Sequence, residues 1–438
     1  MVKHEVISTR VPRTVGPGLD ERGLEFYATR YLADQPDAPR PDELVSYCRG
    51  TGAMQNIAIA IGLASLSNLR KDRDLNLYAR EKYATALRQT SKLVMSSQIQ
   101  QGAREFALSL RSVITLALFE VVNRKGSVVS TSTATTHIQG AIALFKLALQ
   151  FPHAAQEDAR NALQFIPSQM TATPMPPAFF EVLGRCGELL EGAPDKVCVD
   201  VALAIAEACR LSAQMNQTAY TDGRAPVEAF LQQLVALQAI LDLLEDRLQE
   251  PYPFQENRWD YDPAVLFRGR WHSYGGIWPA RIWNHFRWAR ILLNEMLLKS
   301  TIEYPISSGR FITAAHKDRC FSISRRMAED ILISTPSHWH HPRLDRETAR
   351  KFEPPSQGGA GAIGVPPLLW HLKVAGSARG VSPELWKWSY ETIQVVWKDL
   401  GMQHAIAIAN IMESERGIQR KNVVTRKIKV EEAAVDGL

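Results

Sequence analysis

Apolar residues recur at helical spacing along most of this chain, and the period-two alternation typical of strands is hard to find. The most apolar stretch, residues 54–70, is hydrophobic on nearly every side, which predicts a helix buried in the middle of a domain. Residues 75–94 follow with Ala79, Tyr83 and Leu87 on one face, the pattern of an amphipathic helix that packs against the first. The chain is therefore expected to be all-α.

The same periodicity predicts further helices over residues 104–123, 137–151, 197–215, 226–248 and 282–298. A Ser/Thr-rich joint over residues 126–136 predicts a loop between the first two of them. No internal repeat of about 34 or about 40–47 residues is present, which counts against a regular helical solenoid. We expect one large, irregular multi-helix domain.

The borders of this domain follow from composition. Residues 1–19 carry no hydrophobic periodicity and predict a flexible lead-in, so the helical domain is expected over residues 20–415. Prolines gather in residues 167–177 and 251–263, and these segments are candidate internal boundaries because proline is excluded from helix interiors. Residues 416–438 form a tail that is first basic and then acidic.

The formal net charge of +5 resides in that tail. Its first part holds six basic residues and no acidic one: Arg416, Arg420, Lys421, Arg426, Lys427 and Lys429. Without them the chain is close to neutral, so the charge alone does not indicate a nucleic-acid-binding body. The six residues are candidates for nuclear import or nucleic-acid contact, with a merely solvated end as the alternative.

Two features bear on the compartment. The first fifteen residues lack the apolar run of a secretory signal, and the longest apolar stretch, residues 57–66, is shorter than the about 20 residues that span a bilayer. The five cysteines, Cys48, Cys186, Cys198, Cys209 and Cys320, are odd in number and scattered, so neither a disulfide framework nor a zinc pattern can be drawn. Neither export nor membrane insertion is expected, and reduced thiols fit the nucleus or the cytoplasm.

Two motifs suggest ligands but lack the required context. Residues 359–364 match G-x-G-x-x-G, yet they follow prolines rather than a strand, so a flexible glycine loop is favoured over dinucleotide binding. The run His338-Trp339-His340-His341 is dense in imidazoles, but no H-E-x-x-H accompanies it and a metal would need ligands from elsewhere. No metal and no cofactor are therefore predicted.

Catalytic motifs are likewise incomplete. Asp242, Glu245 and Asp246 lie on about one helical turn, but the D-D-x-x-D of magnesium-dependent terpene cyclases is missing, and a solvated helix face is favoured. No G-x-S-x-G elbow and no catalytic cysteine setting is found. We predict no catalytic residue and no enzymatic activity.

Aromatic residues are unusually dense in one region. Half of the ten tryptophans lie within thirty residues, at Trp259, Trp271, Trp278, Trp283 and Trp288. Such a band usually fills a helical core, and its alternative is an apolar ligand pocket with Arg281 or His285 as the polar anchor. The pocket candidates are Trp271, Trp278, Arg281, Trp283 and His285.

Three blocks of sequence carry a family pattern. In the first, residues 78–87 stand where the pattern has "Y..A+..L", and they lead to Phe119-Glu120 and to residues 137–141, which are similar to "H..GA..L". In the second, residues 281–293 read as "WN..R..RI.L". In the third, residues 368–376 and 401–405 are similar to "L.WPL..AG" and "G...A". Together they resemble the regulatory region of fungal zinc-cluster transcription factors, over about residues 20–415.

The resemblance implies an irregular all-helical regulatory domain that senses small molecules, dimerises or contacts other transcription proteins. It implies a nuclear regulator of a fungal gene set, such as a secondary-metabolite cluster. The alternative is a cytoplasmic small-molecule-binding protein or cofactor-free enzyme built on the same scaffold.

The chain departs from the family in its cysteines. A zinc cluster needs six cysteines in a compact arrangement, whereas Cys48 stands alone and the next cysteine is Cys186. The DNA-binding module is therefore lost, encoded outside this sequence or supplied by a partner protein. Direct sequence-specific binding of DNA by this chain is not expected.

Overall fold

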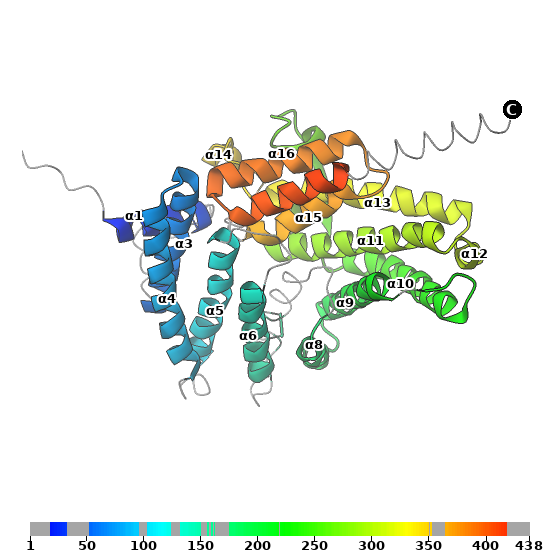
Figure 1. The fold of residues 1–438 in the computed structure, drawn as a ribbon, viewed down its shortest axis with the longest axis horizontal. Helices are drawn as coiled ribbons and strands as arrows, with labels where there is room; N and C mark the ends of the chain where they lie inside the picture. The colour runs from blue at the N-terminus through cyan, green and yellow to red at the C-terminus, as the bar shows by residue number, and fades with distance from the viewer. Residues whose placement is uncertain are drawn as a thin grey trace, which may run out of the picture.

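The computed structural model describes residues 18–32, 52–95, 103–123, 132–149, 156, 159–160, 162, 175–218, 220–349, 351–352 and 364–417. Within these residues the fold is an irregular array of helices with one two-stranded hairpin, which confirms the all-α prediction (Figure 1). Several predicted features lie outside the described residues, namely the lead-in up to residue 17, Cys48, residues 167–174, residues 359–363 of the glycine motif, and Arg420 with the rest of the tail.

The first helices form a tight group. They are α1 (Leu19–Tyr27), with a π-helical turn over Ala28–Leu32, then α3 (Gly52–Arg70) and α4 (Arg73–Met95). As expected from its composition, α3 is buried on most sides. It meets α1 at Gly62, where an added Cβ would lie only 1.9 Å from the carbonyl oxygen of Gly23. Two glycines therefore allow the two backbones to touch.

The next helices carry the chain across the molecule. They are α5 (Ala103–Asn123), α6 (Ser132–Leu149), α8 (Pro177–Leu189), α9 (Lys196–Gln217) and α10 (Ala225–Gln249). The predicted loop over residues 126–136 was wrong in its second half, because α6 already begins at Ser132. Serine and threonine are favoured at helix starts, so a Ser/Thr-rich run before an apolar helix is compatible with its first turn.

A hairpin interrupts the helices in the proline-rich segment after α10. Strand β1 (Phe254–Arg258) pairs antiparallel with β2 (Arg270–Tyr274), with Asn257 opposite Trp271. The sequence did not predict these strands, because they are too short and too polar to show a clear alternation of apolar and polar residues.

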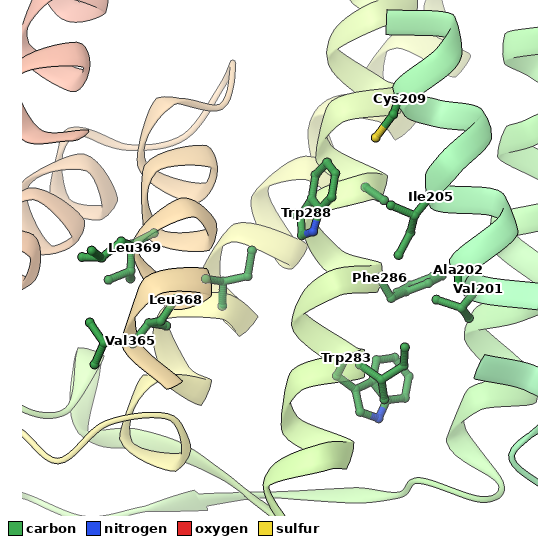
Figure 2. Packing of buried hydrophobic residues seen from close by; sticks show 14 of the residues in the cluster. Val201, Ala202, Ile205, Cys209, Trp283, Phe286, Trp288, Val365, Leu368 and Leu369 are labelled. Carbon is green, nitrogen blue, oxygen red and sulfur yellow. The ribbon is translucent and has the colours of Figure 1, made fainter. Parts of the chain in front are cut away.

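The long helix α11 (Ile277–Glu303) runs through the centre of the second half (Figure 1). Around it lie α12 (Pro305–Ser308), α13 (Ala314–Ser334), α14 (Arg346–Ala349), α15 (Val365–Ser377), α16 (Pro383–Leu400) and a last helix over residues 403–417. On one side α11 packs against α9 and α10, and on the other against α13 and α15. Figure 2 shows Phe286 of α11 facing Ala202 of α9.

The segment after α16 packs against the early helix α3. Gly401, after α16, has φ +63°, and a Cβ there would lie 2.5 Å from the carbonyl oxygen of Ser65 in α3. The side-chain amide of Asn68 donates to the carbonyl oxygens of Val122 (2.9 Å) and Gly401 (2.8 Å). One hydrophobic cluster extends from Tyr27 to Met412.

Helix α10 is the only described helix whose length and composition would let it cross a membrane. In this structure its stripe of leucines is buried, and α10 packs against α9 and α11. Ile240 and Leu243 remain exposed on its outer side.

Candidate functional site

Helix α11 carries polar side chains deep in the protein. Asn284, His285, Arg287, Arg290 and Asn294 are each at most 1% exposed. Because burying a polar or charged group is unfavourable unless it finds partners, each of these side chains calls for an explanation.

The middle of α11 is well satisfied. Arg287 donates to the hydroxyl of Tyr274 (2.8 Å) and to Oδ1 of Asn284 (3.0 Å), and its Nε lies 3.8 Å from Asp330 of α13. Burial raises the pKa of Asp330, and the Arg287 guanidinium opposes this shift. His272 of β2 lies 3.2 Å from the Tyr274 hydroxyl, and burial together with Arg287 lowers its pKa to about 2, so the ring is neutral.

The second buried arginine pairs with the acidic cluster of α10, although its Nε has no hydrogen-bond partner among the described residues. Arg290 donates to Asp242 at 2.6 Å, and Asp242 also pairs with Arg319 of α13 at 2.8 Å. Glu245 pairs with Arg326 at 2.5 Å. Asp242 and Glu245 are therefore half-buried rather than fully solvated, because arginines of α11 and α13 pair with them, whereas Asp246 is exposed as predicted.

The start of α11 is different. Nε2 of His371, from α15, lies 3.1 Å from Nδ1 of His285, and both rings are 1% exposed. Nε2 of His285, Nδ1 of His371 and Nε of Arg281 are shielded from solvent, and none of the described residues forms a hydrogen bond with these atoms. Within the described part of the chain no carboxylate forms an ion pair with Arg281. These three side chains form what we call the α11–α15 cluster.

Charge at the α11–α15 cluster is set by burial. Burial lowers the pKa of His285 to about 3, and the neighbouring Arg281 lowers it further in the same direction. Burial and its histidine neighbours hold the pKa of His371 well below its ordinary value. Burial alone lowers the pKa of Arg281 to about 10, so the guanidinium stays charged at neutral pH. The cluster thus combines one cation with two neutral imidazoles.

Of the five pocket candidates, the structure brings together Arg281 and His285, which lie one turn apart on α11. The other three are elsewhere. The indole of Trp283 donates to the carbonyl oxygen of Tyr252 at 2.7 Å, and Trp278 lies beside the Tyr252 hydroxyl. Trp271 packs edge-on against Phe352, with ring centroids 5.4 Å apart, in a separate small cluster.

Two histidines of this region, His371 and His338, were not among the residues that the sequence analysis proposed for the pocket. His371 replaces the proline of the "L.WPL" pattern, and this departure was the signal that could have marked it. His338 belongs to the histidine run weighed as a metal site, and its Nε2 instead lies 2.8 Å from the Asn284 amide. Among the described residues no three His, Cys, Asp or Glu side chains are placed to hold a metal ion.

Only the first of the six basic tail residues is described. Arg416 lies in the last helix, with its guanidinium 4.0 Å from the ring centroid of Trp386. The other five, Arg420, Lys421, Arg426, Lys427 and Lys429, lie outside the described residues.

The α11–α15 cluster offers hydrogen-bonding groups and one positive charge. An imidazole whose pKa is near 3 is neutral at pH 7, so His285 can donate or accept a hydrogen bond. Arg281 adds a positive charge that no carboxylate of the described residues neutralises in an ion pair. No family model, no curated protein and no solved structure matches the chain.

Proposed function

We propose that this chain is a transcriptional regulator of a fungal gene set, for example a secondary-metabolite cluster, acting in the nucleus through its helical domain. Its partners would be other transcription proteins, a DNA-binding protein or a second copy of itself. One observation supports the proposal: residues of the three family-like blocks, separate in the sequence, contact one another across the helices of this fold.

In the first block, three separated motif residues meet. The Tyr83 hydroxyl donates to Glu120 at 2.7 Å and lies 2.8 Å from Nε2 of His137. The Tyr83 ring also stacks on Phe119, with centroids 4.1 Å apart. The motif residues of α4, α5 and α6 thus contact one another, as expected if this sequence pattern reflects the way that the three helices pack.

The second and third blocks also meet. Trp288 of α11 packs edge-on against Trp370 of α15, and His285 contacts His371. Gly376, the last residue of the "L.WPL..AG" pattern, lies where a Cβ would be 2.8 Å from Met412. These contacts support treating the three blocks as parts of one domain, and the regulatory role follows from the family that they resemble.

The proposal is tested by locating the tagged full chain and by comparing transcripts with and without its gene. We expect nuclear accumulation and altered transcripts of a limited gene set. Replacing the five basic tail residues from Arg420 to Lys429 by glutamine should reduce accumulation if the tail is the import signal. A cytoplasmic chain whose loss leaves transcripts unchanged would contradict the proposal.

The unpaired α11–α15 cluster favours a second candidate, a cytoplasmic protein that binds a small molecule. In that case the same scaffold would act without transcription proteins, and the tagged chain would stay in the cytoplasm. Localisation therefore separates the two candidates, whereas ligand binding by itself does not.

A further inference from the structure

Helix α11 carries two buried arginines, Arg287 and Arg290, and the half-buried Arg281, and the three differ in their partners. Arg287 faces Asp330 at 3.8 Å, and Arg290 faces Asp242 at 2.6 Å. Arg281 has no acidic partner among the described residues, although its Nε is shielded from solvent. Arg281 is half-buried, and Nε of Arg290 also lacks a hydrogen-bond partner among the described residues, so the absence of a carboxylate beside Arg281 is what sets it apart. Because a charge that is partly withdrawn from water is normally paired, Arg281 indicates a place for an anion.

The neighbouring imidazole supplies a second donor. If Nε2–H of His371 donates to Nδ1 of His285 across their 3.1 Å contact, the His285 proton must be on Nε2. This nitrogen is shielded from solvent and has no partner in the described chain. His285 is one helical turn from Arg281, so both unpaired donors belong to the same stretch of α11.

We propose that Arg281 and His285 bind the carboxylate group of a small organic acid. A planar carboxylate has two oxygens, which match one guanidinium and one imidazole N–H. A phosphate carries more charge and three strong acceptor oxygens, and no second cation is paired to this site. Arg281 is half-buried whereas both histidines are fully buried, so the carboxylate enters from the Arg281 side.

Carboxylate binding does not depend on the proposed role in transcription. An acid bound here would be an effector of a regulator or the ligand of a cytoplasmic binding protein. Its test uses the purified full chain, so its outcome is independent of localisation and of transcripts.

The experiment measures the dissociation constant of radiolabelled acetate by equilibrium dialysis at pH 7, with inorganic phosphate as a competitor. Wild type should bind acetate saturably at one site. Arg281→Gln should weaken binding by about tenfold or more, since it removes the only charge of the site. Arg281→Lys should retain part of the affinity, and His285→Gln tests the second donor in a chain whose arginine is intact.

The matched control is Arg325→Gln, which changes an exposed arginine of α13 that donates a hydrogen bond to the carbonyl oxygen of Gly380 at 3.4 Å. It should bind acetate as wild type does. Non-saturable binding, or equal affinity in wild type, Arg281→Gln and His285→Gln, would overturn the proposal. Tighter binding of phosphate than of acetate would also overturn it, in favour of an oxyanion site of another class.

Discussion

At the residue scale, the partners of a buried group say more about its role than its type does. Arg287, Arg290 and His338 all have partners nearby, and their contacts hold α11 to its neighbours. Arg281 and His285 lack partners on the sides described above. The sequence led to both of these residues through the tryptophan band, but it did not indicate His371, which comes from a helix 86 positions later.

The pH dependence of stability follows from the buried histidines. His285 has a pKa of about 3 in the folded chain and about 6.5 when unfolded, so the unfolded chain binds more protons between these values. The free energy of unfolding should therefore fall as the pH falls below about 6.5. His285 alone should cost about 2 kcal/mol at pH 5.

Urea unfolding of wild type and His285→Gln at pH 7.5, 6 and 5 checks this expectation. The variant should lose less stability on acidification, by about 2 kcal/mol at pH 5. The raised pKa values of Asp330 and Glu295 act in both proteins and cancel in the comparison. Parallel pH profiles of the two proteins would show that His285 is not held neutral by the fold.

Two glycines with positive φ allow the stability cost of an unfavourable backbone conformation to be distinguished from the cost of a steric clash. Gly401→Ala introduces a Cβ at φ +63° and 2.5 Å from the Ser65 carbonyl oxygen, whereas Gly192→Ala introduces one at φ +76° with no atom within 4 Å. The free energy of unfolding should fall by about 3 kcal/mol for Gly401→Ala and by about 1 kcal/mol for Gly192→Ala. Equal losses in chemical denaturation would refute the close approach of α16 to α3.

At the element scale, the hydrophobic periodicity predicted where the helices lie in the sequence, but it did not predict which helices pack against one another. The predicted core helix over residues 54–70 corresponds closely to α3, and that over residues 226–248 to α10. The ion pair between Asp242 and Arg290 was missed because the sequence of α10 does not show which residue of another helix will lie beside it. The β1–β2 hairpin was missed because its strands are five residues each and depend on packing against α11 and α13.

The link between α3, α5 and the end of α16 depends on one side chain. Asn68→Ala leaves the carbonyl oxygens of Val122 and Gly401 without their bonds in a buried place, so the free energy of unfolding should fall by about 2–3 kcal/mol. Asn56, on the same helix, also makes two bonds, to the Gly52 carbonyl oxygen (2.9 Å) and to Gln89 (3.0 Å), but is half-buried.

Asn56→Ala is therefore the matched control for Asn68→Ala. It should lower the free energy of unfolding by less than about 1 kcal/mol, because water can replace the lost partner. Urea denaturation of both variants measures the difference. If the two substitutions cost the same, the Asn68 contacts do not hold the ends of the domain together.

At the scale of the whole molecule, the contacts between helices form a closed path that begins and ends at α3. Contacts run from α3 through α5, α6, α8 and α9 to α11, and then through α15 and α16 back to α3 (Figure 1). The family-like blocks lie at the start, middle and end of this path.

Tethering the full chain to an unrelated DNA-binding module, upstream of a reporter gene in a fungal cell, tests the regulatory role most directly. We predict that the fusion raises or lowers reporter transcription relative to the module alone, and that Gly401→Ala weakens this effect because it destabilises the domain. A fusion that is nuclear, as abundant as the module alone and without effect on the reporter would contradict the proposed function.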